Sequence, residues 1–311
     1  MVKKELFKLQ SLYRDDLRVT GYEFGHGNKS ACILGGMRGN EVQQVYICSQ
    51  IVQELKKLES SGAIAKDCSI MVIPSVNSYS LNIESRFWPV DHTDINRMFP
   101  GYDLGETTQR IAAGVFEAIN DYKYGIQFPS FYLPGDFVPH VRMMDTGFQD
   151  VNLASDFGLP YVVVKKPKPY DTTTLNYNWQ LWGTHAYSVY TSACNEVQEE
   201  TARQAVGSVL RFLAKQGIIK YKGHSGYISS VVASNELVTV KTNVAGIYLP
   251  KVGYDTQVEK GQVLATILNP NDGEKLEDII APVDGVVFFA YHNSMIYSNT
   301  VAYRLIGDTH K

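Results

Sequence analysis

The turn that decides the fold reads GGMRGNE, from Gly35 to Glu41. An apolar run, Ala31 to Leu34, leads into its two glycines, and apolar residues at helical spacing follow it. These are Val42, Val45, Ile47, Ile51, Val52 and Leu55. The pattern predicts a strand, a tight turn and a helix in direct succession.

Similar units recur up to about residue 220, where apolar β-rich runs alternate with amphipathic helices. Strands are expected at Ile70–Pro74 and Tyr161–Val164, and helices at Gly105–Asn120 and Glu196–Gln216, the last ended by Gly217. This alternation is typical of an α/β sandwich with a largely parallel or mixed sheet. We therefore predict an α/β domain over residues 1–220.

From about Tyr221 the chain changes to short alternating strands without an amphipathic helix, which predicts an all-β domain over residues 221–311. A weak internal repeat resembles the two halves of a lipoyl-like barrel-sandwich hybrid. No Met-Lys-Met hairpin is present, so a lipoylated or biotinylated lysine is not indicated. The repeat matches Ala245–Ile247 and Val258–Leu264 with Asp284–Val286 and Ile296–Ala302.

Composition narrows the classes of partner. The formal net charge is −3, with no basic stripe of the kind that binds nucleic acid. No run approaches the roughly 20 apolar residues that cross a bilayer, and the N-terminus carries no signal-peptide core. We expect a cytoplasmic protein with no membrane or nucleic-acid partner. The cysteines are widely spaced and suit reduced packing positions, with a nucleophilic Cys194 as the alternative.

A second motif, Asp94 to Gly101, reads DINRMFPG and follows Arg86 and Pro89. It is similar to a DLNRxFPG signature. Together with GGMRGNE and the β-rich tail, it makes the chain resemble the succinylglutamate desuccinylase/aspartoacylase family over nearly its whole length. The resemblance implies a zinc-carboxypeptidase-like α/β/α sandwich with a mixed sheet. Members of that family hydrolyse N-acyl amino acids with one zinc held by His, Glu and a second His.

The same resemblance implies that the first zinc histidine is replaced by Arg38, three residues before a retained Glu41. A carboxylate without its metal in a partly dry cleft is unfavourable unless another cation pairs with it. We therefore predict an ion pair between Arg38 and Glu41 at the metal position.

The second zinc histidine is matched by the stretch Gly125–Ser130, with its register set by Pro139–Arg142, which resembles the family's Pro-x-Val-Arg. The resemblance then puts Gln127 at the family's aspartate and Pro129 at the histidine. Proline has no side-chain donor atom for a metal.

The family's general-base glutamate corresponds to Tyr190 in the stretch Gly183–Tyr190. With a reference pKa near ~10, tyrosine is a poor base at neutral pH. Zinc-bound water ionises near pH ~7 and free water near ~15.7, so losing the metal removes the nucleophile. We predict that the ordinary zinc mechanism is lost.

The family's Asn-Arg pair, which grips the substrate carboxylate, corresponds to Asn96 and Arg97. Arg38 beside them would make the pocket more cationic, because guanidinium groups suit carboxylates. The alternative is a structural pair that supports the turn into Phe99–Gly101. Aromatic residues at positions 170–182 are expected to form either a pocket wall or an interface.

A rebuilt metal site is the alternative to metal loss. Its candidate ligands are Glu41, His92, His140 and His185, although no two of these histidines share a compact metal-binding spacing.

Two function classes follow. The first is a pseudoenzyme without a cofactor that binds a small carboxylate or acyl-amino-acid ligand, or that supports a homo-oligomer or a hetero-oligomer with an active relative. The second is an active, zinc-dependent amidohydrolase that cleaves N-acyl amino acids through a rebuilt site.

Overall fold

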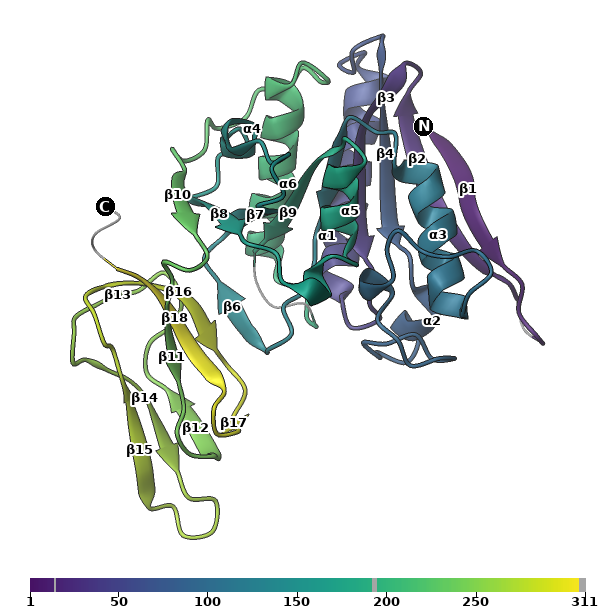
Figure 1. Cartoon of the computed structure of the whole chain (residues 1–311). Coiled ribbons are helices and arrows are strands. Elements are labelled where there is room, and N and C mark those ends of the chain that lie inside the picture. The colour runs from purple at the N-terminus through teal and green to yellow at the C-terminus, as the bar shows by residue number, and fades with distance from the viewer. Residues whose placement is uncertain (14, 192–194, 308–311) are drawn as a thin grey trace.

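A computed structural model describes residues 1–13, 15–191 and 195–307, and a nine-stranded mixed sheet is its central element (Figure 1). The strand order is β1-β2-β4-β3-β5-β9-β7-β8-β10. β3, β4, β5 and β9 run parallel in this sheet, whereas β7 is antiparallel to β9. The strands are β1 Val2–Leu9, β2 Leu17–Gly25, β3 Asn28–Gly36, β4 Cys68–Ser75, β5 Tyr124–Gln127, β7 His140–Met144, β8 Tyr161–Lys165, β9 His185–Tyr190 and β10 Ser230–Ala233.

Helices cover both faces of this sheet. The alternation of side chains along β3 shows how, since Ala31 and Ile33 join the core under α1 and α6, whereas Cys32 and Leu34 join the core under α3 and α5. The predicted α/β/α sandwich is confirmed. The helices are α1 Val42–Ser60, α2 Ser78–Leu81, α3 Thr107–Ile119, α4 Val151–Ser155, α5 Leu175–Leu181 and α6 Glu199–Lys215, with 3₁₀ turns η1 Ile95–Arg97 and η2 Pro169–Asp171.

The helix expected from Gly105 begins at Thr107 instead. Glu106 forms a capping box with Gln109, in which each residue satisfies a backbone amide of the other at the helix start. The Glu106 backbone is therefore extended rather than helical.

The C-terminal part consists of two antiparallel sheets around a separate core. One has the order β11-β18-β16-β13, and the other has the order β15-β14-β12-β17. The strands are β11 Val238–Lys241, β12 Gly246–Pro250, β13 Gln257–Val258, β14 Val263–Leu268, β15 Lys275–Ile280, β16 Gly285–Tyr291, β17 Met295–Ile296 and β18 Val301–Gly307.

The predicted internal repeat is confirmed by the strand pairing. β12 pairs with β14 of its own half and with the short β17 of the other half. In the same way, β16 pairs with β18 of its own half and with the short β13 of the other half. Exchange of the short strands buries one common core between the two halves.

Strand pairing also connects the two parts of the chain. β6 (Gly135–Phe137), which precedes β7, pairs with β16 of the C-terminal sheet. β10 lies beyond residue 220, where we expected the domain boundary, and extends the nine-stranded sheet by pairing with β8. Residues of both parts therefore meet near β7, β8 and β10 of the large sheet. Among the helices of the described residues, none has the length and apolar character needed to span a membrane.

Candidate functional site

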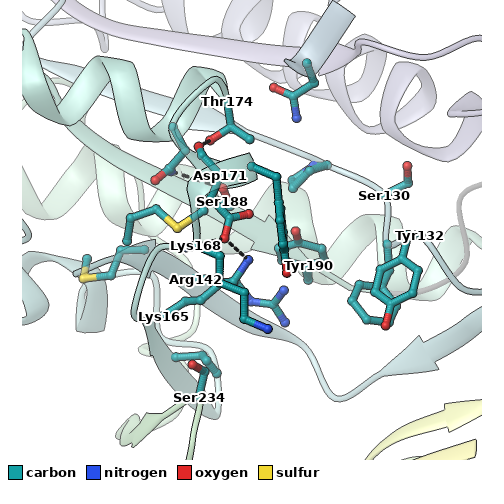
Figure 2. A pocket seen from close by; sticks show the side chains of 18 of the residues that line it. Ser130, Tyr132, Arg142, Lys165, Lys168, Asp171, Thr174, Ser188, Tyr190 and Ser234 are labelled. Carbon is teal, nitrogen blue, oxygen red and sulfur yellow. Dashed lines mark hydrogen bonds and ion pairs between the residues drawn. The ribbon is translucent and has the colours of Figure 1, made fainter. Parts of the chain in front are cut away.

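A cavity of about 470 Å³ lies beyond the carboxyl ends of β3, β5 and β9. This edge is where open α/β sheets usually bind ligands, because the loops that follow the strands converge there. The described lining residues include five arginines and three lysines against one aspartate, so the cavity is strongly cationic (Figure 2). The charged residues are Arg38, Arg86, Arg97, Arg142, Arg304, Lys165, Lys166, Lys168 and Asp171.

The glycines of GGMRGNE allow the turn after β3 to pack closely against its neighbours. A Cβ atom on Gly39 would lie 2.2 Å from the backbone of Ser80, and one on Gly35 would lie 2.6 Å from the carbonyl oxygen of Pro74. These distances exclude a side chain at either position. The turn thereby presents Arg38 and Glu41 at one end of the cavity.

The Glu41 carboxylate is fully buried and has a protein donor at every acceptor site. Its Oε2 accepts from the backbone amides of Met37 at 2.8 Å and Arg38 at 3.0 Å. Its Oε1 accepts from Arg38 Nη1 at 2.8 Å and from the Ser130 amide and hydroxyl at 3.0 and 2.5 Å. A carboxylate offers about four lone-pair sites, and five donors fill them.

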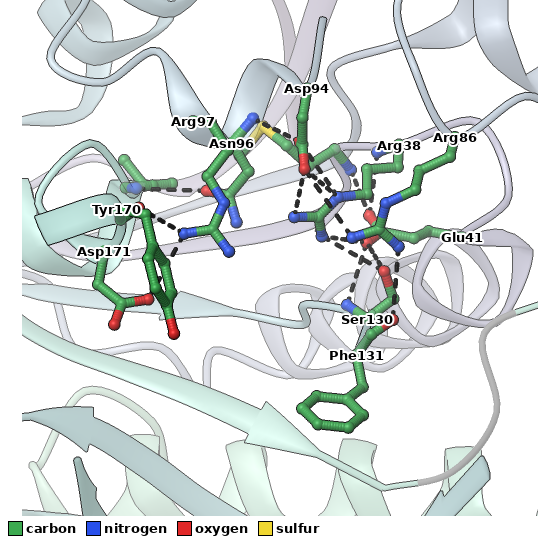
Figure 3. Close-up of polar contacts among 12 residues, drawn as sticks. Arg38, Glu41, Arg86, Asp94, Asn96, Arg97, Ser130, Phe131, Tyr170 and Asp171 are labelled. Atoms are coloured by element: carbon green, nitrogen blue, oxygen red, sulfur yellow. Dashed lines mark hydrogen bonds and ion pairs between the residues drawn. The ribbon is translucent and has the colours of Figure 1, made fainter. Parts of the chain in front are cut away.

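The Arg38 side chain, 3% exposed, lies between two carboxylates (Figure 3). The predicted ion pair with Glu41 is confirmed, and Asp94 adds a second one, with its Oδ2 3.0 Å from Arg38 Nε and 2.9 Å from Nη2. Burial alone would lower the pKa of the guanidinium, but the two carboxylates outweigh burial and raise it. The charge of Arg38 at this end of the cavity is therefore balanced by carboxylates of the protein.

Asn96 and Arg97 both line the cavity, and both also make contacts within the protein. The Asn96 side chain accepts a hydrogen bond from the Leu175 amide at 3.3 Å. Arg97 donates to the Tyr170 carbonyl at 2.6 Å and lies 3.5 Å from the Asp171 carboxylate. Asn96 thus contacts the start of α5, whereas the structural alternative expected support of the turn into Phe99–Gly101. Arg97 is held in place with 37% of its side chain exposed.

The sequence analysis did not identify Asp171 or Lys165. Their ion pair is 2.7 Å long, and Asp171 is almost fully buried. Burial lowers the pKa of Lys165, and this effect outweighs that of Asp171, which raises the pKa. The basic run at residues 165–168, which reads KKPK, was the sequence signal for this cationic wall.

Tyr190 stacks against His140, with ring centroids 5.1 Å apart and an interplanar angle of 1°. His140 is fully buried, and both of its ring nitrogens have partners. Nδ1 lies 2.8 Å from the Val138 carbonyl, which can only accept, so Nδ1 carries the proton. Nε2 is then free to accept from Arg142 Nη2 at 3.1 Å. Burial and Arg142 hold the pKa of His140 well below its usual value, so the ring is neutral.

The three histidines considered for a rebuilt metal site lie apart from one another. His92 is exposed on a turn, and His185 begins β9, about 16 Å along the strand from Tyr190, which is paired with His140. No group of three His, Cys, Asp or Glu side chains within the described ranges is arranged to hold one metal ion.

The remaining candidate side chains also have defined positions. Tyr170 lines the cavity, whereas Trp179 is buried in the core against Gly125. Cys32 and Cys48 are buried free thiols whose pKa values are raised by burial, as expected of packing residues. Cys194 lies outside the described residues.

These features define the class of protein, an α/β/α sandwich with a mixed sheet followed by an all-β domain. Residues 28–215 match the model of the succinylglutamate desuccinylase/aspartoacylase catalytic domain. The chain therefore belongs to the succinylglutamate desuccinylase/aspartoacylase family.

Solved structures with the same fold extend the similarity over almost the entire chain. A succinylglutamate desuccinylase from Silicibacter sp. has a TM-score of 0.83 at 18% identity, covering 97% of this chain and 93% of that one. Product-bound ectoine utilization protein EutE (DoeB) from Ruegeria pomeroyi gives 0.80 at 17%, covering 97% and 94%. An aspartoacylase family protein from Mesorhizobium loti gives 0.79 at 20%, covering 98% and 93%. No curated protein sequence matches the chain.

Proposed function

We propose that this family member has lost the zinc-hydrolase site and binds a small carboxylate or acyl-amino-acid ligand in the cationic cavity. The observation that carries the proposal is the state of Glu41, the retained position among the three zinc ligands expected from the family. Both of its oxygens are filled by protein donors, one of which belongs to the Arg38 side chain.

The residues at this end of the cavity do not fit zinc. A protein zinc site uses thiolate, imidazole or carboxylate ligands, and a catalytic site has three of them. Arg38 presents a permanent positive charge where the family has a histidine, and the side chain of Pro129 has no donor atom. A divalent cation would therefore have to displace a buried guanidinium that is held by two carboxylates.

Within the part of the chain that the structure describes, neither Tyr190 nor His140 replaces the hydrolytic base of the family. Tyr190 stacks on His140 and lies beneath the Arg142 guanidinium, whose carbon is 4.3 Å from the centre of the Tyr190 ring. The phenol of Tyr190 is a poor base at neutral pH. Both ring nitrogens of His140 are occupied by other contacts. We assign no hydrolytic step to the site.

Ligand binding is supported by the charge and size of the cavity. Its volume of about 470 Å³ lies within the usual range for small-molecule sites. Arginine recognises carboxylates through paired hydrogen bonds, and Arg97 is the family's carboxylate-gripping position. The solved relative from Ruegeria pomeroyi holds a bound product, which supports the binding of a small molecule by this fold.

The test is to incubate purified protein, with and without added zinc, with N-acetylaspartate and with N-succinylglutamate. We expect calorimetry to detect binding of at least one of them, with no release of acetate or succinate. Arg97→Gln should weaken binding about tenfold, because it removes one charge-assisted contact. Zinc-dependent release of either acid by wild-type protein would instead support the active amidohydrolase.

A further inference from the structure

Lys165 is the last residue of β8, and it lines the cationic cavity (Figure 2). Its side chain is 24% exposed, and its Nζ lies 2.7 Å from Asp171 Oδ2. A lysine side chain is a nucleophile as the neutral amine, whereas the ammonium form has no electron pair to donate. The surroundings of Lys165 therefore decide whether this residue can react with a ligand in the cavity.

The carboxylate of Asp171 is shared between two cations. Its Oδ2 pairs with Lys165 and also accepts a hydrogen bond from the backbone amide of Lys168 at 3.0 Å. Its Oδ1 lies 3.5 Å from Arg97 Nη1. Asp171 is buried, so one negative charge faces two positive side chains in a place that water hardly reaches. Positive charge therefore remains in excess around the amino group of Lys165.

Arg142 adds positive charge from the neighbouring strand. β7 runs parallel to β8, with Arg142 opposite Val163. Val163 and Lys165 point to the same face of the sheet, because side chains alternate along a strand, so Arg142 is a diagonal neighbour of Lys165 on the cavity side. Burial, Arg142 and Arg97 lower the pKa of Lys165, and together they outweigh Asp171. Desolvation and neighbouring cations are the conditions that make a lysine nucleophilic.

Lys57 on α1 forms a comparable ion pair in different surroundings. Its Nζ lies 2.6 Å from the carboxylate of Glu54, but its side chain is 70% exposed and does not line the cavity. Bulk water solvates the ammonium group of Lys57, whereas Lys165 is partly withdrawn from water beside other cations. The two lysines thus differ in solvation and in access to a ligand, although each has a carboxylate partner.

We propose that Lys165 forms a protonated imine with the carbonyl group of a small 2-oxo acid whose carboxylate is bound by Arg97. This inference rests on the proposed function and deepens it, because it names the class of carboxylate ligand. Arg97 and Lys165 contact the two oxygens of one carboxylate, that of Asp171, so a small molecule can reach both. A 2-oxo acid carries its carboxylate directly beside a carbonyl group, which suits this arrangement.

The reaction balances without an oxidant or a reductant. Asp171 accepts a proton from the ammonium group of Lys165, and the free amine attacks the carbonyl carbon to form a C–N bond. Asp171 returns this proton to the carbonyl oxygen and then moves a second proton from the nitrogen to the same oxygen. The C–O bond breaks and water leaves. The products are the protonated imine and one water molecule, and Asp171 is again a carboxylate.

The test is reductive trapping of the full chain at neutral pH. Wild-type protein is incubated with pyruvate and cyanoborohydride, which reduces an imine to a stable secondary amine, and peptide mass mapping locates the label. We expect at least about tenfold more label on Lys165 than on Lys57, because the bound carboxylate holds the carbonyl group beside the amine. Acetone, which has no carboxylate, should label Lys165 at least about tenfold less than pyruvate does.

Three variants locate the effect. Lys165→Arg keeps the positive charge beside Asp171 but cannot form an imine, so the label at this position should disappear. Lys57→Arg is the matched control and should leave the labelling of Lys165 unchanged. Asp171→Asn should slow the labelling of Lys165, because it removes the group that moves the protons. If Asp171→Asn does not fold, Lys165→Arg and the comparison of pyruvate with acetone still decide the outcome.

Calorimetry with lactate separates this inference from the proposed function, since lactate has the carboxylate of pyruvate and a hydroxyl group in place of the carbonyl. Binding of lactate without labelling of Lys165 by pyruvate would overturn the imine and leave the proposed function standing. Equal labelling of Lys165 and Lys57, or equal labelling of Lys165 by acetone and pyruvate, would also overturn it. If no label appeared and lactate, N-acetylaspartate and N-succinylglutamate all failed to bind, both proposals would fail together.

Discussion

The two ends of the cavity each contain a buried arginine, and their surroundings are opposite. Arg38 is 3% exposed and pairs with Glu41 and Asp94, whereas Arg142 is 8% exposed and has no carboxylate partner among the described residues. Nearly equal burial therefore accompanies different electrostatic states. The first arginine is neutralised within the protein, whereas the second has no counter-ion among the described residues.

Substitution of Arg38 should have the largest effect on stability, since it removes the cation that pairs with Glu41 and Asp94. Arg38→Met leaves the buried carboxylate of Glu41 without its cation and leaves Asp94 only the more distant Arg86, 3.9 Å away, so the free energy of unfolding should fall by about 3–5 kcal/mol. Urea unfolding monitored by circular dichroism measures the change. The double variant Arg38→Met/Glu41→Gln should lose less than the sum of the single variants, because it removes one stranded charge. A loss below about 1 kcal/mol for Arg38→Met would contradict the ion-paired role.

The pH dependence of stability should report on His140, whose ring nitrogen accepts a hydrogen bond from Arg142. The pKa of His140 is lowered in the folded protein by burial and by Arg142, so the unfolded chain binds a proton that the folded chain does not. The contribution to stability is complete above the ordinary pKa of about 6.5 and declines as the pH falls below it, by up to about 1.4 kcal/mol per pH unit.

His140→Gln should remove this contribution, and urea unfolding at several pH values between neutrality and mild acid measures it. His292, whose pKa is raised by its hydrogen bond to Asp136, has the opposite dependence: its stabilisation is present below pH ~6.5 and lost above its folded pKa. Because His292 is present in both proteins, its effect cancels in the comparison. Equal slopes for the wild type and His140→Gln would show that His140 is not held neutral.

Substitution of Arg142 should change stability much less than substitution of Arg38, because Arg142 has no carboxylate partner among the described residues. Arg142→Met replaces an unpaired buried cation by an apolar side chain, and we expect a change within about 1 kcal/mol in either direction without ligand. Thermal unfolding with saturating succinate is the second readout, since the variant should lose most of the stabilisation that the wild type gains. A loss similar to that of Arg38→Met would mean that Arg142 is part of the structural framework.

Arg97→Gln should have the smallest effect on stability. The ion pair with Asp171 is 3.5 Å long and partly exposed, and such pairs contribute about 0–1 kcal/mol. Urea unfolding beside Arg110→Gln gives the comparison, because Arg110 is exposed on α3 and does not line the cavity. A stability loss clearly larger than 1 kcal/mol would assign Arg97 to structure rather than to ligand binding.

Local patterns in the sequence were sufficient to predict the fold. The apolar run before Gly35 and the helical spacing after Glu41 predicted β3 and α1, and the repeat in the tail predicted two similar halves. The exchange of β13 and β17 between those halves comes from the structure. The ion pair between Arg38 and Glu41 was predictable from the family resemblance, and the partners are only three positions apart in one tight turn.

The rest of the site depends on contacts between distant parts of the chain. Asp94 lies 56 residues from Arg38, and Arg142 and Arg304 line the same cavity only after strands of the two domains have paired. In the sequence, the Pro139–Arg142 stretch only fixes a register. No local pattern indicated that Arg142 would be buried without a partner. The expected oligomer and the expected location in the cell stay predictions.

The most direct test of the central claim is the metal content of untagged protein that has been supplied with zinc and then dialysed. We predict far less than one zinc ion per chain, because Arg38 and other donors of the protein fill the acceptor sites of Glu41. Retention of close to one zinc ion per chain would contradict it, and would direct attention to Glu41 and the histidines as ligands of a rebuilt site.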